Sequence, residues 1–278
     1  MQPSIAVIND ISGYGRCSVT VALPILSVMK IQCGVIPTAI LSNHTEYPEY
    51  SILDFTPHMS DYIAHWKHLN FTFDGVYTGF LGSKEQIAII TQLFESFSFR
   101  QKIVDPVMGD HGTIYDSYTP DMCEAMKELV AHATLTTPNL TELCILTDNA
   151  YRADLSASKI QAMCEQLAAT NNQQIAVTGI EHDGKIGNAI YENGHFEILY
   201  GEKVFPLRPG TGDVFASILA GCSLHNMPLH DAVQLASTFI HTCLVSSAAM
   251  NIPINDGVCF EEHLDMLIPK KPGGIHYV

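Results

Sequence analysis

Residues 75–105 read GVYTGFLGSKEQIAIITQLFESFSFRQKIVD and contain a complete strand–helix–strand pattern. A short apolar strand is expected over 75–78, and residues 84–97 carry apolar side chains at helical spacing. A second short strand is expected over 102–105. Because two strands joined by a crossover helix pair in parallel, this stretch predicts a parallel sheet covered by helices.

The same alternation extends along the chain in both directions. Two arms, 186–191 and 195–200, flank Asn193-Gly194, which is a strong signal for a β-hairpin. We therefore predict an α/β fold with a single doubly wound, mostly parallel sheet, a small lid or hairpin, and one domain over residues 1–278. The remaining expected strands are 5–8, 35–41, 135–136 and 174–178, and the remaining expected helices are 19–29, 57–68, 120–132, 139–146, 156–169, 212–224 and 228–248.

Composition limits the partners and the cellular setting. The 278 residues include 29 acidic and 14 basic side chains, which gives a formal net charge of −15 and argues against a nucleic-acid partner. The eight cysteines are scattered without a C-x-x-C pair, and the N-terminus predicts no signal peptide, so we expect a reduced cytoplasm. The apolar segment 229–250 contains His230, Asp231, Gln234 and His241, and predicts a buried or amphipathic helix instead of a membrane span.

The sharpest motif is Pro209-Gly210-Thr211-Gly212-Asp213 at the start of an expected helix. Its two glycines let the backbone approach a ligand closely, and a helix N-terminus presents unpaired N–H groups, so the motif predicts an anion hole. Phosphoryl transfer needs such a cradle together with a base that accepts the proton of the acceptor hydroxyl. Asp213 is the candidate base, and the alternative is that it only caps the helix. The chain contains no Walker P-loop and no G-x-G-x-x-G motif.

Two acidic motifs follow expected strands. Asp105 and Asp110 flank a tight turn and can face one hard cation. In the segment 137–142, Asn139 is expected to cap a helix with Glu142 as its capping-box partner, an alternative to a metal-binding role for Glu142. Because Mg²⁺ takes one or two carboxylates plus substrate phosphates, these three carboxylates would suffice for a magnesium site.

The fourth motif is the polar segment Ser42-Asn43-His44-Thr45-Glu46-Tyr47, which follows the expected strand 35–41. Its hydrogen-bonding side chains could bind a polar heteroaromatic ligand, and a plain exposed loop is the alternative.

These four motifs, in this order, resemble the ribokinase-type superfamily and, within it, the pyridoxal/pyridoxamine kinases. The resemblance covers essentially the whole chain and includes Tyr77-Thr78-Gly79-Phe80-Leu81-Gly82, which is similar to a mid-sheet motif of that family. It implies ATP-dependent phosphorylation of the 5′-hydroxymethyl group of pyridoxal, pyridoxine or pyridoxamine, with Mg²⁺ as cofactor. A kinase for hydroxymethylpyrimidine or another small alcohol, and a non-catalytic protein that binds vitamin B6 or nucleotide, are the alternatives.

The resemblance also implies roles for individual residues. Asp213 would be the general base, and the anion hole would be formed by Gly210, Thr211 and Gly212. The expected nucleotide contacts are Asp105, Thr137, Asn139, Glu142 and Thr178, and the expected metal ligands are Asp105, Asp110 and Glu142. The expected substrate contacts are Asp10, Ser42, His44, Thr45, Tyr47 and Asp213. A homodimer is also implied, and the need for a monovalent cation besides Mg²⁺ stays open.

The first loop departs from the pyridoxal kinase pattern. Those enzymes commonly have a serine just after the first strand, where this chain has Asn9-Asp10. Asp10 resembles the first loop of the hydroxymethylpyrimidine kinases, and it could pair with a pyridinium N–H or with an amine. Two cations near the motifs, Lys185 and Arg208, could each reach a phosphate or simply face solvent.

Overall fold

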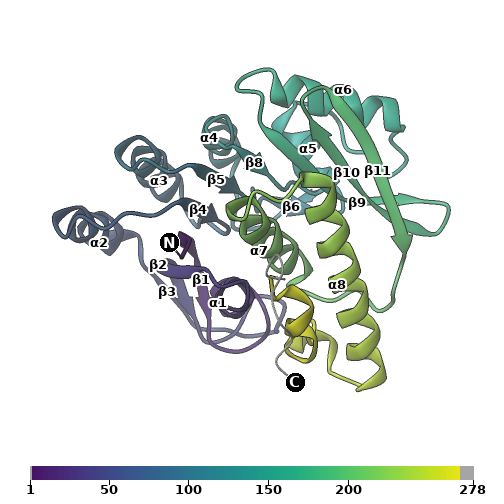
Figure 1. Cartoon of the computed structure of the whole chain (residues 1–278), viewed down its shortest axis with the longest axis horizontal. Coiled ribbons are helices and arrows are strands. Elements are labelled where there is room, and N and C mark those ends of the chain that lie inside the picture. The colour runs from purple at the N-terminus through teal and green to yellow at the C-terminus, as the bar shows by residue number, and fades with distance from the viewer. Residues whose placement is uncertain (1, 270–278) are drawn as a thin grey trace.

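The computed structural model describes residues 2–269, and nine strands of this part form one sheet (Figure 1). The order across the sheet is β11-β10-β9-β8-β5-β4-β1-β2-β3. The strands are β1 (Ser4–Ser12), β2 (Gln32–Leu41), β3 (Ile52–Asp54), β4 (Gly75–Thr78), β5 (Gln101–Val104), β8 (Leu135–Thr136), β9 (Gln174–His182), β10 (Lys185–Glu192) and β11 (His195–Glu202).

Pairing from β2 through β1, β4, β5 and β8 to β9 is parallel. Only the margins are antiparallel, where β3 pairs with β2 and where β9, β10 and β11 form a meander. The predicted doubly wound, mostly parallel sheet with a hairpin is therefore confirmed. A separate short ribbon pairs β6 (Gly109–Asp110) with β7 (Thr113–Ile114).

The hairpin between β10 and β11 turns at the expected dipeptide. Asn193 has a φ of 51° and Gly194 a φ of 81°, the two positive values that a two-residue type I′ turn requires. Asp183 and Gly184 show the same pair of positive φ angles between β9 and β10. The sequence prediction ended the earlier strand at Thr178 and missed this Asp-Gly turn, which carries β9 on to His182.

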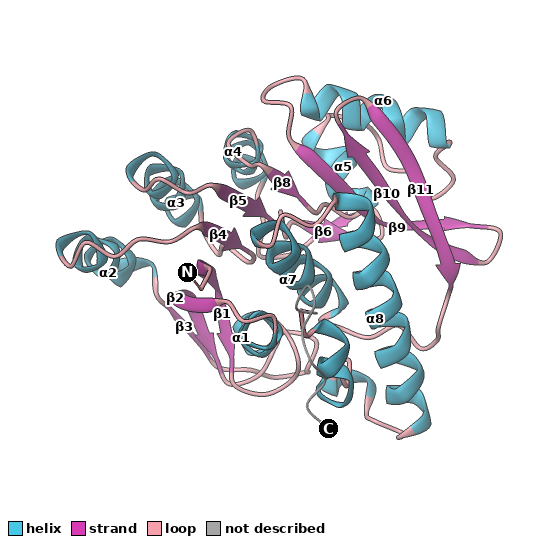
Figure 2. Ribbon diagram, in the orientation of Figure 1, coloured by secondary structure: helices cyan, strands magenta, loops and turns pink. Residues whose placement is uncertain are grey.

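Helices cover both faces of the sheet (Figure 2). One layer contains α1, α7 and α8, and the other contains α2, α3 and α4, which α5 and α6 continue over β9 and β10. The helices are α1 (Val19–Val28), α2 (Thr56–His68), α3 (Lys84–Ser96), α4 (Pro120–Val130), α5 (Leu140–Leu146), α6 (Ala157–Ala168), α7 (Thr211–Leu224) and α8 (Leu229–Ala249), followed by the 3₁₀ turns η1 (Ile254–Asp256) and η2 (Glu261–Leu267).

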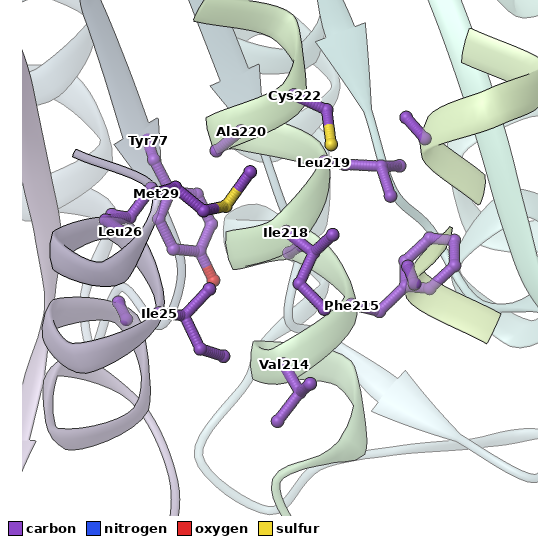
Figure 3. Packing of buried hydrophobic residues seen from close by; sticks show 14 of the residues in the cluster. Ile25, Leu26, Met29, Tyr77, Val214, Phe215, Ile218, Leu219, Ala220 and Cys222 are labelled. Atoms are coloured by element: carbon purple, nitrogen blue, oxygen red, sulfur yellow. The ribbon is translucent and has the colours of Figure 1, made fainter. Parts of the chain in front are cut away.

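The apolar sequence of β1 explains the two layers. Ile5 and Val7 pack with α1 and α7, whereas Ala6 and Ile8 pack with α2 and α3, and none of the four is exposed. A continuously apolar strand is what a parallel sheet with two covered faces requires. Figure 3 shows α7 at the centre of the first layer, with Ile25, Leu26 and Met29 of α1 on one side of it and the Tyr77 ring of β4 behind these side chains.

Within residues 2–269, α8 is the one helix whose length and composition would allow it to cross a membrane. Its buried residues, which include Leu229, Val233 and Phe239, belong to the core that it shares with α7. The core helix of a layered α/β protein passes the same test of length and composition, and the packing of α8 agrees with the expected buried or amphipathic helix.

Candidate active site

The carboxyl ends of the central strands and the N-terminus of α7 meet at one edge of the sheet. The chain leaves β1 for β2 on one side and later returns to β4 on the other side, so the winding direction reverses between β1 and β4. Ligands of open α/β sheets bind at such a switch point. Asp213, in the first turn of α7, lies there, because its Oδ1 is 3.3 Å from Asn9 Nδ2 of β1.

The residues of the predicted anion hole lie at the start of α7. Gly210 is the N-cap residue with a φ of 82°, and a Cβ at this position would overlap with the carbonyl oxygen of Arg16. Gly210 is therefore required both for its conformation and for the close approach of the first loop. At Gly212 a Cβ would meet open space, and the residue is exposed. The start of α7 is thus open at Gly212, and because the first N–H groups of a helix have no partner within the helix, the predicted anion hole is compatible with this geometry.

Asp213 is half-buried beside this anion hole. Burial raises the pKa of its carboxyl group to about 6, and the negative charge of Asp10 adds to the rise, whereas the Ser18 backbone amide and the Asn9 side chain lower it. A carboxylate with a pKa close to neutral pH can accept a proton during a reaction and release it afterwards.

Asp10 lies under the first loop with an exposed fraction of 6%. Ser18 Oγ donates to its Oδ1 at 2.5 Å, and Ser12 Oγ donates to its Oδ2 at 2.9 Å. Burial raises the pKa of this carboxyl group despite both hydrogen bonds. Asp10 therefore joins β1 to the start of α1, and its expected contact with a substrate stays a prediction.

Asp105 follows β5 and is almost fully buried. Thr137 Oγ1 donates to its Oδ1 at 3.0 Å. Burial raises the pKa of Asp105 well above its usual range, and the nearby carboxylates of Glu142 and Asp213 add to the rise. A buried carboxylate next to other carboxylates provides the hard oxygen ligands that Mg²⁺ prefers, so the residues present fit this cation.

Glu142 and Asn139 form the expected capping box at the start of α5. Asn139 Oδ1 accepts from the Glu142 amide at 3.0 Å, and Glu142 Oε2 accepts from the Asn139 amide at 2.8 Å. Both side chains also hold the loop after β5, since Glu142 Oε1 accepts from the Met108 amide and Asn139 Nδ2 donates to the Gly109 carbonyl. The structure thus gives Glu142 a capping role, and metal binding by Glu142 stays a prediction.

Asp110 lies apart from the other two carboxylates. It is exposed on β6, and its Oδ1 accepts from the His111 amide at 2.7 Å. Among residues 2–269, no three His, Cys, Asp or Glu side chains come together closely enough to hold a metal ion. The expected set of Asp105, Asp110 and Glu142 is therefore not assembled as a three-ligand cluster, because the β6–β7 ribbon carries Asp110 outward.

The remaining nucleotide candidates do come together. Thr178 forms a parallel bridge with Asn139, and its amide donates to the Pro138 carbonyl at 2.9 Å. The segments after β8 and within β9 therefore lie side by side next to Asp105. Arg208 lies elsewhere: it is 7% exposed and donates to the carbonyls of Ile252, Pro253 and Gly257. Its guanidinium group does not face solvent, so the solvent-facing alternative for Arg208 is wrong, and its contact with a phosphate stays a prediction. Lys185 is exposed.

The polar segment 42–47 forms a loop with its own internal bonds. Ser42 Oγ donates to Asn43 Oδ1 and accepts from the Ser51 amide, and Thr45 is exposed. His44 is buried, with Nε2 at 2.6 Å from the Asn255 carbonyl oxygen. His44 therefore anchors the loop, and its expected contact with a substrate ring stays a prediction.

An aromatic hollow lies on this loop. The rings of Tyr14 and Tyr47 are 6.0 Å apart, and both hydroxyl groups donate to the carboxylate of Asp256, at 3.3 and 2.7 Å. The hollow has a volume of about 480 Å³, within the usual range for small-molecule sites, and is lined by Tyr14, Asn43, Tyr47, Pro48 and Glu49.

Three residues that organise the site were assigned no site role from the sequence. Asn9 directly follows the expected strand 5–8, so the rule of polar residues after strands points to it, but that rule does not specify its role. Arg16 donates from Nε to both carboxylate oxygens of Glu261 at 2.7 and 2.9 Å and from a terminal nitrogen to the Asp256 carbonyl. No sequence signal predicts the roles of Arg16 and Asp256, because their partners lie more than 200 residues away along the chain.

A nine-stranded sheet with helices on both faces, two glycines at the start of α7 and a carboxylate in its first turn are typical of a small-molecule kinase of the ribokinase-like fold. The family model for phosphomethylpyrimidine kinase matches residues 31–257. The chain belongs to this family, and it is a phosphotransferase that acts on an alcohol group.

Individual relatives agree with this class. A pyridoxine/pyridoxal/pyridoxamine kinase from Bordetella avium (strain 197N) is 29% identical over 265 residues, which cover 87% of this chain and 86% of the relative. A candidate phosphomethylpyrimidine kinase from Bacteroides thetaiotaomicron, crystallised with pyridoxal, is 33% identical with a TM-score of 0.90, covering 98% of both chains. Pyridoxal kinase from Lactobacillus plantarum is 27% identical with a TM-score of 0.91, covering 96% of both chains. The predicted resemblance to the pyridoxal kinases is confirmed.

Proposed function

We propose that the protein is an ATP-dependent kinase that phosphorylates the 5′-hydroxymethyl group of a vitamin B6 vitamer. The observation that carries this proposal is Asp213, a half-buried carboxylate beside the anion hole, whose pKa burial raises to about 6. The Bacteroides thetaiotaomicron relative crystallised with pyridoxal supports a B6 vitamer as the acceptor.

In the proposed reaction the hydroxyl oxygen of the acceptor attacks the γ-phosphorus of ATP. A bond forms between these two atoms, the bond from the γ-phosphorus to the oxygen bridging it to the β-phosphorus breaks, and ADP leaves with the electron pair. Asp213 accepts the hydroxyl proton, and the N–H groups at Gly210, Thr211 and Gly212 stabilise the negative charge on the phosphoryl oxygens. The pKa of Asp213 suits this role, because the carboxylate is largely ionised at neutral pH.

The nucleotide side of the proposal uses the residues at the ends of β5, β8 and β9. Asp105 would hold Mg²⁺ together with the phosphates, and its position near Asp213 supports this role. Mg²⁺ would supply positive charge that offsets the phosphate charge during transfer. Thr137, Asn139 and Thr178 would line the nucleotide, Glu142 would hold the loop around it, and Asp110 would act only through water.

The first experiment compares ATP consumption with pyridoxal, pyridoxamine, pyridoxine and hydroxymethylpyrimidine as acceptors. We expect turnover of at least one B6 vitamer, and a decrease of about 10²–10⁴-fold in Asp213→Asn, because the proton acceptor is lost. Asp154→Asn is the matched control, since Asp154 is exposed and pairs only with Arg152 among the described residues.

Each other outcome identifies an alternative. Turnover retained by Asp213→Asn would contradict the assigned base. Turnover of hydroxymethylpyrimidine alone would favour the acceptor after which the family model is named, and Asp10 would then be the residue to explain. Tight binding of a vitamer without any product would indicate a non-catalytic binding protein.

We also propose a cytoplasmic homodimer. All eight cysteines are unpaired and seven are buried, which suits a reducing compartment. Light scattering on the purified chain tests the dimer, and a mass close to 30.5 kDa would contradict it.

A further inference from the structure

Asn9 occupies a special position at the end of the β1–β4 pairing. β1 and β4 pair as far as Ile8 and Thr78, and the register of β1 against β2 shifts between Asn9 and Ile11. Such a bulge changes the direction of a side chain next to a site. Asn9 is 1% exposed, so its amide group must find its partners inside the protein.

The partners of Asn9 fix the orientation of its amide. Oδ1 accepts from the backbone amides of Phe80 at 2.8 Å and Asp10 at 3.0 Å. Because only the carbonyl oxygen can accept two N–H groups, Nδ2 must point the other way. There it donates to Asp213 Oδ1 at 3.3 Å.

Gly79 provides the space for this amide. A Cβ at position 79 would overlap with the Asn9 amide, whose three outer atoms are its nearest neighbours. Gly79 has no positive φ, so space and not conformation requires glycine here. The Gly79 amide donates to the Ile8 carbonyl at 2.9 Å, which holds the two backbones together at this point.

We propose that Asn9 is a positioning residue for proton transfer: it holds Asp213 by Oδ1, so that Oδ2 is directed at the acceptor hydroxyl, and Gly79 creates the space in which Asn9 does this. The inference rests on the proposed role of Asp213 as the base. It gives a function to the motif Tyr77–Gly82, which receives the Asn9 amide at Gly79 and Phe80.

The Asn9 amide also favours the ionised form of Asp213, because a donor stabilises a carboxylate. Other groups near the Asp213 carboxylate influence its ionisation as well. Asp10 on β1 opposes ionisation of Asp213 by like charge, and the charge of Asp213 in turn raises the pKa of Asp105 after β5. The Cys17 thiol of the first loop and the Tyr77 hydroxyl of β4 also lie near, and both stay neutral at working pH because burial raises their pKa values.

The direct test is the pH profile of kcat/KM for Asn9→Asp. This variant keeps the shape and the accepting oxygen of Asn9 and replaces only the donor. We expect the acid limb of the profile to move up by at least about one pH unit, with roughly a tenfold loss of kcat/KM below it, because like charges raise the pKa of the base. Asn188→Asp is the matched control, because it makes the same charge change at another place in the fold. Asn188 of β10 donates to Ser237 of α8.

A second test acts through Asn9 without touching Asp213. Gly79→Ala should displace the Asn9 amide and lower kcat about tenfold or more, with little change in the KM for ATP. In an Asn9→Ala background the space is free, so adding Gly79→Ala should lower kcat less than twofold further. The coupling between Asn9→Ala and Gly79→Ala can be measured even if the Asn9→Asp variant fails to fold.

The outcomes separate this inference from the proposed function. If Asp213→Asn is inactive while the Asn9→Asp profile matches wild type, or the two alanine substitutions act additively, the positioning role is wrong and the base stands. If Asp213→Asn stays active, the base itself is wrong. An acid limb that moves in Asn9→Asp but not in Asn188→Asp, together with non-additive alanine substitutions, supports the positioning role.

Discussion

Asp213 has a pKa of about 6 in the folded chain, whereas an aspartate in an unfolded chain has a pKa of about 3.9. Between these two values the folded state binds more protons than the unfolded state. Stability therefore falls as the pH rises through this window, and at neutral pH the ionised carboxylate destabilises the fold. The ionised Asp213 carboxylate that the proposed reaction needs therefore lowers the stability of the fold.

This conflict predicts that Asp213→Asn stabilises the protein while it lowers turnover about 10²–10⁴-fold. At pH 7.5 we expect the free energy of unfolding to increase by about 1–2 kcal/mol, allowing for partial exposure, and Tm to rise by roughly 2–6 °C. At pH 4 the gain should disappear, since the wild-type carboxyl group is then also protonated. Thermal unfolding at both pH values measures this, and a lower Tm at pH 7.5 would show that the ionised Asp213 is well stabilised.

At the scale of elements, the 3₁₀ turn η1 connects the loops of the site. Its Asp256 accepts from Tyr14 and Tyr47, one from each of the two loops that border the hollow. The adjacent Asn255 carbonyl lies 2.6 Å from His44 Nε2. Residues 254–256 thus form a clasp that joins the first loop to the loop 42–47.

The clasp predicts a selective effect on the acceptor. Tyr47→Phe removes one hydrogen bond to a carboxylate, worth about 1 kcal/mol at this half-exposed position, so KM for the vitamer should rise about fivefold. KM for ATP should stay within twofold. Asp256→Asn should act similarly, and the double variant should be no worse than the more affected single one.

Tyr50→Phe is the control, because Tyr50 is exposed and follows the same loop. Steady-state kinetics with each substrate varied in turn measures the effect. Equal increases of both KM values would mean that the clasp supports the whole site and not the acceptor loop.

The elements themselves were largely predictable, for reasons that differ between them. α3 was identified because apolar side chains recur at helical spacing, α4 because a proline opens its first turn, and the β10–β11 hairpin because Asn193-Gly194 favours its turn. β3, β6 and β7 were missed, since these strands are short and mostly exposed, whereas the equally short β8 is buried and was predicted. The 3₁₀ turn η1, which is also short, was missed as well, and with it the clasp.

At the scale of the whole molecule, the sequence located the glycines before α7 and Asp105 because each follows a strand or begins a helix in an alternating fold. The sequence could not show which role each carboxylate has in the structure. Glu142 has both oxygens engaged by backbone amides, and Asp110 faces solvent on the β6–β7 ribbon. Such distinctions depend on distances across the sheet, which neither motif nor spacing specifies.

The charge of the whole molecule adds a last consequence. The chain carries a net charge of −15, and Asp10, Asp105, Glu142 and Asp213 all have raised pKa values near one edge of the sheet. A free nucleotide brings further negative charge to this edge, whereas its magnesium complex brings less. Nucleotide binding should therefore depend on the cation.

We expect saturating ATP with Mg²⁺ to raise Tm by about 5–10 °C, as expected for a ligand at about 100 times its Kd, and ATP with EDTA to raise it by less than about 2 °C. Asp105→Asn removes one of the repelling charges and the proposed ligand together. The variant should therefore lower the Tm shift with Mg²⁺ and raise the Tm shift with EDTA, so that the two shifts become more alike. Asp154→Asn should leave both shifts unchanged. Equal shifts with and without Mg²⁺ in the wild type would mean that protein groups alone neutralise the phosphates, and the cation would then have no place at Asp105.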